Sequence, residues 1–139
     1  MNEWKNDREG KIFFIDKLEK SGFNNVTTTD QYSYYDIEGE WNGIKYYFEL
    51  KNRPCESTLY NDSIIEKTKY DNLYQLNKEH NSVFIVNFFT DCYHIHHLLS
   101  PHTTQNHYCQ KTNNWNRTKV PKTLISYMNT NKTRREYDS

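Results

Sequence analysis

The chain has 139 residues, of which 26% are charged and 16% aromatic, and its 18 basic and 18 acidic residues cancel to a formal net charge of zero. This length predicts one domain that buries roughly two thirds of the surface of its unfolded chain. The chain has no apolar run long enough to cross a membrane and starts with the polar stretch MNEWKNDREG, so we expect a cytoplasmic protein without membrane span or signal peptide.

The first predicted elements are a helix and a strand. Residues 3–20 are expected to form the helix, which ends at Ser21-Gly22 because glycine is favoured directly after a helix. Residues 23–30 are expected to form the strand. Glu9, near the start of the helix, has an ordinary role as a surface residue that compensates the helix dipole.

A hairpin is predicted next, because Asn42-Gly43 stands between two runs rich in Tyr, Ile, Trp and Phe and both turn residues must accept positive φ. The strands 34–41 and 44–51 then pair with Asp36 opposite Glu49. Side chains alternate along a strand and opposed residues share a face. The face expected to be the apolar core holds Tyr35, Ile37, Trp41, Ile44, Tyr46, Phe48 and Leu50. The other face holds Asp36, Glu38, Glu40, Lys45, Tyr47, Glu49 and Lys51.

The opposed acids point to a metal site. Like charges directly across a sheet repel each other unless a cation lies between them. Mg²⁺ binds oxygen ligands, and the carboxylates of Asp36 and Glu49 together with substrate phosphate oxygens suit it. Lys51, two residues further on the same face, is placed to orient or deprotonate a water and to offset phosphate charge. The pattern therefore predicts a site for phosphodiester hydrolysis.

Asp36, followed after twelve residues by Glu49-Leu50-Lys51, resembles the D…(D/E)xK signature of the PD-(D/E)xK nuclease superfamily. Tyr35 stands where the family name has proline. The resemblance covers residues 3–99 and implies an α+β or α/β fold. Its restriction-endonuclease-like core has a central mixed β-sheet with an antiparallel hairpin, flanked by helices.

The same resemblance implies the roles of the site residues. Mg²⁺, or Mn²⁺ as its substitute, would be bound by Asp36, Glu49, the backbone carbonyl of Leu50 and Glu9. Lys51 would position or activate the attacking water, and Lys69 would help at the scissile phosphate. The alternative for Lys69 is a solvated lysine on an exposed helical face. DNA is the implied substrate, with RNA still open, and a homodimer is a possible assembly.

Further elements follow the hairpin. Ser63 and Glu66 match a capping box, which predicts a helix over residues 64–79. The apolar run 82–89 is typical of a buried strand. Residues 92–99 are expected to form the return strand.

Two histidines of that return strand, His94 and His96, share a face. They are the beginning of a possible zinc site, but neither a cysteine pair nor an HExxH motif accompanies them. We expect them to be surface or groove residues.

The C-terminal part is basic. Residues 111–139 hold seven basic and two acidic residues, so this segment carries +5 and the rest of the chain −5. The asymmetry favours a nucleic-acid contact, with a merely solvated tail as the alternative. Within it, 119–128 is expected to be a strand confined to a sheet edge by Pro121. The domain is expected to span 1–128, followed by a flexible basic tail, 129–139.

Together these features predict a Mg²⁺-dependent deoxyribonuclease. The lack of alanine and the abundance of Asn, Lys and Tyr are typical of an AT-rich genome, such as that of a phage or mobile element. Two alternatives stay open: a catalytically silent nucleic-acid-binding module and a protein-interaction module on the same fold.

Overall fold

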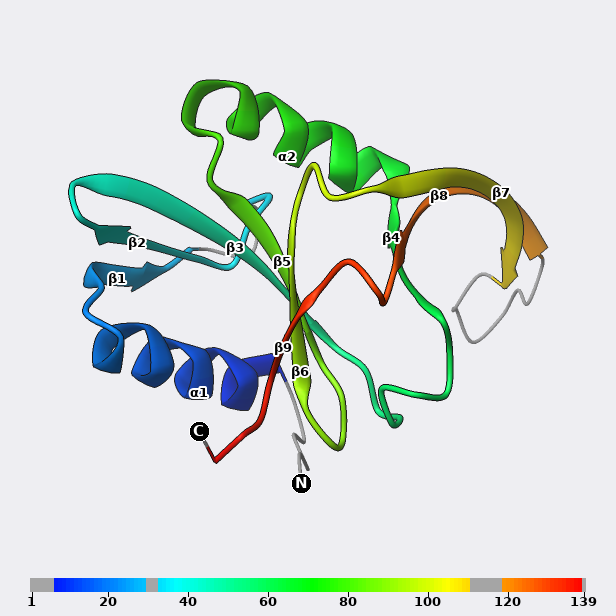
Figure 1. Ribbon diagram of the computed structural model, residues 1–139. Coiled ribbons are helices and arrows are strands. Elements are labelled where there is room, and N and C mark those ends of the chain that lie inside the picture. Colours follow the sequence, from blue (N-terminus) through cyan, green and yellow to red (C-terminus); the bar gives the residue numbers. More distant parts are fainter. Residues whose placement is uncertain (1–6, 30–32, 111–118, 139) are drawn as a thin grey trace.

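The computed structural model describes residues 7–29, 33–110 and 119–138 (Figure 1). A six-stranded sheet has the strand order β1-β2-β3-β5-β6-β9, and a three-stranded sheet has the order β4-β8-β7. The elements are α1 (Asp7–Lys20), β1 (Asn24–Thr28), β2 (Ile37–Trp41), β3 (Ile44–Asn52), β4 (Asp62–Glu66), α2 (Lys67–His80), β5 (Val83–Phe88), β6 (Tyr93–His97), β7 (His102–Gln110), β8 (Lys119–Met128) and β9 (Thr133–Arg135).

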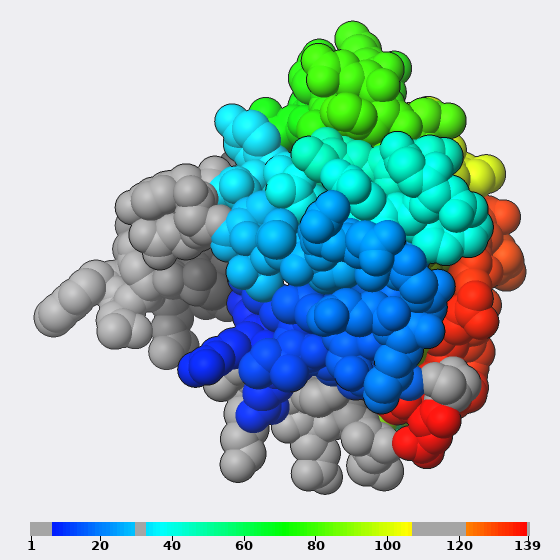
Figure 2. Space-filling model, turned by 90° about the vertical axis from the view of Figure 1, so that its left-hand side faces the viewer, coloured from blue at the N-terminus to red at the C-terminus, as the bar shows by residue number. Residues whose placement is uncertain are grey.

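The large sheet has α1 on one face and α2 together with the small sheet on the other. Figure 2 shows three of these parts as layers: α1 in blue, the hairpin of β2 and β3 in cyan, and α2 in green. The sheet is mixed, because β3 pairs antiparallel with β2 and parallel with β5. This confirms the predicted α+β fold with a central mixed sheet. Neither of the helices in the described part of the chain is long and apolar enough to span a membrane.

The hairpin has the predicted register. β2 and β3 pair from Trp41 opposite Ile44 to Ile37 opposite Phe48. The turn residues Asn42 and Gly43 have φ values of 52° and 78°, as such a turn requires.

The face of the hairpin under α1 is apolar, as predicted. Phe14 and Leu18 of α1 pack there on Ile37 and Phe48, and the rings of Phe14 and Phe48 meet edge to face at 5.0 Å. Two predicted core residues are exposed instead: Trp41 by 42% and Ile44 by 49%. They flank the turn at the end of the hairpin, where the ring of Trp41 stacks on that of Phe23 with the ring centroids 6.4 Å apart.

The opposite face of the hairpin is not simply polar. Tyr47 and Glu49 are each only 4% exposed, because α2 and the small sheet cover this face. Tyr47 belongs to a second core with Leu73 of α2 and Ile125 of β8. Tyr35 was predicted for the face under α1 but packs against this second core, with its ring centroid 4.9 Å from that of Tyr47. It lies before the first residue of β2, so the alternation of side chains along the strand does not determine its direction.

The predicted capping box is wrong. Residues 62–66 form β4, in which Ser63 pairs with Tyr127 of β8, and α2 begins only at Lys67. Ser63 Oγ donates to Asn129 Oδ1 at 3.0 Å, and Glu66 stands at the N-cap without a side-chain capping bond. Side chains alternate between buried and exposed from Ser63 to Glu66, which suits a strand. Pairing with a distant strand thus overrides the local helix signal.

Pro121 does not confine its strand to a sheet edge. β8 is the central strand of the small sheet, so that expectation is wrong. β4 pairs with β8 only from Leu124 to Met128, whereas Pro121 lies opposite Tyr108 of β7. The missing N–H of proline is tolerated because the register of β4 does not reach it.

The expectation of a flexible tail over residues 129–139 does not hold for Thr133–Arg135. These residues form β9, which pairs with β6 at the edge of the large sheet. Beyond it, the hydroxyl of Tyr137 donates to the Cys92 carbonyl at 2.9 Å, and its ring packs on Phe13 and Tyr93. An aromatic anchor therefore ties the end of the chain to the core.

His94 and His96 are buried, so they are not surface residues as one of the two expectations had it, although His94 contributes to the wall of a cavity. They are 2% and 1% exposed, because β6 lies inside the large sheet and their shared face is covered. Burial lowers the pKa of each imidazole from 6.5 to about 4, and the charge of Lys132 adds to the effect. Both rings are therefore neutral at pH 7.

We expect the free energy of unfolding to fall as the pH drops from about 6.5 to about 4. In this window the unfolded chain binds protons on His94 and His96 that the folded chain does not, so acid favours unfolding. Thermal melting as a function of pH tests this. His94→Phe or His96→Phe should flatten the decline, whereas His80→Gln on α2 should not. The same pH dependence in wild type and both phenylalanine variants would contradict the expectation.

Candidate functional site

A cavity of about 270 Å³ opens where β3 continues past the beginning of β2. The first turns of α1 and α2 close its sides. It is lined by Asp7, Gly10, Lys11, Asp36, Glu49, Leu50, Lys51, Asn52, Lys69 and Phe88. The structure thus brings together five of the six predicted site residues, namely Asp36, Glu49, Leu50, Lys51 and Lys69.

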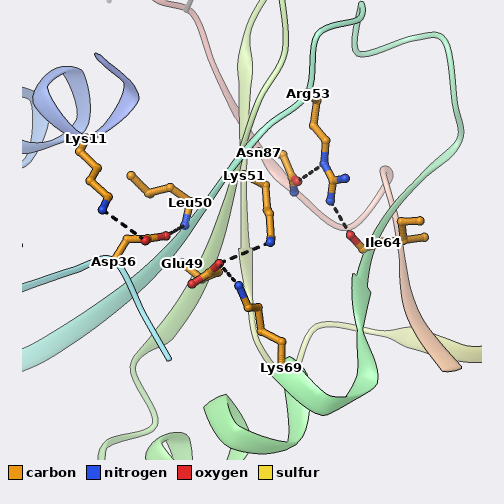
Figure 3. Close-up of polar contacts among 9 residues, drawn as sticks. All are labelled: Lys11, Asp36, Glu49, Leu50, Lys51, Arg53, Ile64, Lys69 and Asn87. Atoms are coloured by element: carbon orange, nitrogen blue, oxygen red, sulfur yellow. Dashed lines mark hydrogen bonds and ion pairs between the residues drawn. The ribbon is translucent and has the colours of Figure 1, made fainter. Parts of the chain in front are cut away.

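Asp36 is held at the edge of the sheet. It precedes β2, and its backbone N–H donates to the Phe48 carbonyl at 2.9 Å. Its Oδ2 accepts the backbone N–H of Leu50 at 2.8 Å, and its Oδ1 lies 3.7 Å from Lys11 Nζ (Figure 3). The N–H and C=O of one strand residue point to the same neighbour. The Leu50 carbonyl therefore faces the same edge as Asp36.

Glu49 is the buried acid of the site. Its Oε1 accepts a hydrogen bond from Lys69 Nζ at 2.8 Å and lies 3.6 Å from Lys51 Nζ (Figure 3). Burial and the negative charge of Asp36 raise the pKa of Glu49, while the two lysines oppose the shift. The predicted repulsion between the two acids is thus present, with lysine ammonium groups partly compensating it.

The two lysines beside Glu49 have opposite tendencies. Burial lowers the pKa of Lys51, and the positive charge of Lys69 adds to this while Glu49 opposes it. Burial is also the largest single influence on the pKa of Lys69 and lowers it, but the hydrogen bond to Glu49 and the charges of Glu49 and Asp36, together with a contact to Lys51, outweigh it, so the net shift is upward. Lys51 is therefore the lysine that releases its proton more easily, and Lys69 is the one that keeps its charge.

Glu9 does not line the cavity, although the family resemblance implied a carboxylate from the first helix. Asp7 and Lys11 of the same helix do. Residues three and four apart share a helix face, so Asp7, Gly10 and Lys11 lie together on the face of α1 that lines the cavity, and Glu9, two residues from Asp7, does not share that face. Asp7 and Lys11 were not predicted to be site residues. Their spacing would have identified them if the inner face of α1 had been known.

The residues present fit a Mg²⁺ ion. The ion needs only one or two carboxylates beside water and substrate phosphate oxygens. Asp36 and Glu49 open into one cavity and repel each other, and the Leu50 carbonyl faces the same place. In the described part of the chain, no three His, Cys, Asp or Glu side chains gather at a metal-binding distance. The fit therefore depends on two carboxylates, not on a full protein cage.

No protein-family model matches the chain, and no curated protein sequence matches it either. The chemistry of this cavity is thus the basis for a functional assignment.

Proposed function

We propose that the protein is a Mg²⁺-dependent nuclease that hydrolyses phosphodiester bonds of DNA, on a restriction-endonuclease-like core of the PD-(D/E)xK type. One observation carries the proposal: Asp36 and Glu49 meet in one cavity, with Lys51 3.6 Å from Glu49. Two acids that destabilise each other without a cation, next to a lysine with a lowered pKa, suit metal-assisted attack of water on a phosphate.

Asp36, Glu49 and the Leu50 carbonyl are the groups that would hold the ion, which supplies a Lewis acid for the phosphate and for the charge that develops on it. Lys51 orients the attacking water. Its lowered pKa favours the release of its own proton, and the neutral amine then takes up the proton of the water. Lys69 keeps its positive charge and directs it to the phosphate. Lys11 holds Asp36 from the side of α1.

The cavity also supplies the charge that DNA needs. Its lining holds three lysines (Lys11, Lys51, Lys69) and three acids (Asp7, Asp36, Glu49), so it is neutral without metal. A divalent cation makes it positive and attractive to phosphate. The basic C-terminal segment is therefore not needed to attract the phosphate. Arg134 of that segment already has an acidic partner, because it lies 2.9 Å from a Glu136 oxygen.

Incubation of the purified protein with nucleic acids tests the proposal. The substrates are plasmid, linear duplex, single-stranded and four-way-junction DNA and an RNA, each with Mg²⁺, Mn²⁺ or EDTA. We expect cleavage of at least one DNA with metal and none with EDTA. Glu49→Gln should be inactive, and Glu79→Gln, at an exposed site on α2, should be active. No cleavage of any substrate, or equal cleavage by Glu49→Gln, would reject the nuclease.

A further inference from the structure

A second cavity, of about 600 Å³, lies beside the cavity of the proposed metal site. Two segments of the chain lead from one cavity to the other. Asn52 and Phe88 line the first cavity, and Arg53 and Phe89, which follow them in the chain, line the second. The volume of the second cavity is in the range of sites that enclose a ligand.

Arg53 lies on the same face of the large sheet as Lys51. Its Nε donates to Asn87 Oδ1 at 3.0 Å, and Asn87 lies opposite Lys51 in the register of β3 and β5 (Figure 3). Two residues along a strand span about 6.8 Å. A group bound by Arg53 would therefore be the neighbour of a group bound at Lys51.

The guanidinium group of Arg53 has one nitrogen that the protein does not use. Nε donates to Asn87, and Nη2 donates to the Ile64 carbonyl. Nη1 makes no hydrogen bond within the described residues. It is also not buried, because the buried side-chain atoms without a partner there all belong to two histidines of β6. The third nitrogen is thus open to a ligand.

The positive charge of Arg53 has no acidic partner among the described residues, and burial lowers the pKa of its guanidinium group. Asp62 is the acid of the cavity wall, but its Oδ2 accepts a hydrogen bond from Ser126 Oγ at 2.6 Å. A planar guanidinium that is fixed by two hydrogen bonds and lacks a carboxylate partner is suited to bind a phosphate.

The remaining wall of the cavity is apolar and open to solvent. Leu59 and Tyr60 are 60% and 63% exposed, and Pro54 is exposed as well. Exposed apolar side chains that gather around a cavity mark a binding surface. The Tyr60 ring offers a face on which a nucleobase can stack, and such stacking does not depend on the base sequence.

A nucleotide matches both parts of this cavity. A free phosphate would leave the apolar wall unused, and an apolar ligand would leave the charge of Arg53 without a partner. The phosphate and the base of a nucleotide supply one group for each. The position next to Lys51 favours a nucleotide of the same strand that the proposed metal site cleaves.

We propose that this cavity holds an unpaired nucleotide of the substrate strand beside the scissile phosphate, with its phosphate on Arg53 and its base on Tyr60. The choice of a nucleic acid as occupant rests on the proposed function. A base inside a duplex has to leave the stack before a protein side chain can enclose it. The site therefore favours single strands, frayed ends and junctions over an intact duplex.

Equilibrium binding to the full chain tests the role of Tyr60. The ligands are a fluorescent single-stranded oligonucleotide and a blunt duplex of the same sequence, with Ca²⁺ in place of Mg²⁺ so that neither is cleaved. Tyr60→Ala should weaken binding of the single strand about tenfold and leave binding of the duplex unchanged, since it removes one stacking ring. Tyr74→Ala, which removes an exposed tyrosine of α2, should bind both ligands like wild type.

Arg53→Gln tests the phosphate contact. It should weaken binding of the single strand and flatten the slope of log K against log salt by about 0.7, the contribution of one phosphate contact on a single strand. Arg135→Gln, which removes an exposed arginine of β9, should keep the wild-type slope. With Mg²⁺ and a single-stranded substrate, Arg53→Gln and Tyr60→Ala should raise KM and leave kcat nearly unchanged.

The outcomes separate this site from the nuclease itself. If Arg53→Gln does not fold, Tyr60→Ala decides, because its side chain is exposed. Wild-type affinity for the single strand in the folded variants, or equal weakening of single strand and duplex by Tyr60→Ala, would overturn the nucleotide site and leave the nuclease intact. A wild type that binds the single strand through both residues but cleaves no nucleic acid would reject the nuclease and support the site.

Discussion

Asp36→Asn and Glu49→Gln should each abolish DNA cleavage while the metal-free protein stays as stable as wild type or becomes more stable. Both changes keep the shape of the side chain. The new amides retain oxygens that accept from Leu50 N–H and from Lys69, as the carboxylates do at 2.8 Å. What is lost is the pair of negative charges that would hold the cation.

The stability part of this expectation follows from the raised pKa of Glu49, which burial and Asp36 cause. A carboxyl group with a raised pKa in the folded state stabilises it below about 4.5, and this contribution is lost as the pH rises. At neutral pH the Glu49 charge is therefore unfavourable for folding, and a neutral glutamine is not. Thermal melts in EDTA beside single-turnover cleavage rates check both parts, with Glu79→Gln as the matched control. Wild-type cleavage in both variants would contradict the assignment.

Lys51→Ala should reduce turnover by roughly 10²- to 10⁴-fold, the usual size of an acid–base contribution, and should affect DNA binding far less. Lys51 is half-buried beside Glu49, and its ammonium has a lowered pKa, so its main action is expected in the transition state. Single-turnover rates and equilibrium binding with Ca²⁺ in place of Mg²⁺ separate the two effects.

The matched control for this variant is Lys67→Ala. Lys67 is the first residue of α2 but pairs with Asp71 at 2.8 Å outside the cavity, so its removal should leave cleavage nearly unchanged. A decrease of less than about fivefold with Lys51→Ala would show that this lysine has a structural role.

The hairpin was predictable because its determinants are local. The Asn42-Gly43 turn fixes the register, and the register alone brings Asp36 next to Glu49 and puts Lys51 on the same side. The predicted acid–acid repulsion therefore follows from about twenty consecutive residues and agrees with the raised pKa of Glu49.

Features that depend on distant pairing were not predictable in the same way. Ser63 and Glu66 carry a helix-capping pattern, but β8, about sixty residues later, pairs with them as a strand. The burial of His94 also depends on segments that are distant in the sequence. β9 pairs with β6 and so makes β6 an inner strand, and other distant segments cover the face of the sheet on which His94 lies. Asp7 and Lys11 join the site only through the way α1 packs on the sheet.

The central claim is that Asp36 and Glu49 form a divalent-metal site, and calorimetric titration with Mn²⁺ measures this most directly. We predict one saturable site in the wild type and in Glu79→Gln, and its loss in the Asp36→Asn, Glu49→Gln double variant. No saturable binding to the wild type, or equal binding to the double variant, would contradict the metal site and the nuclease built on it.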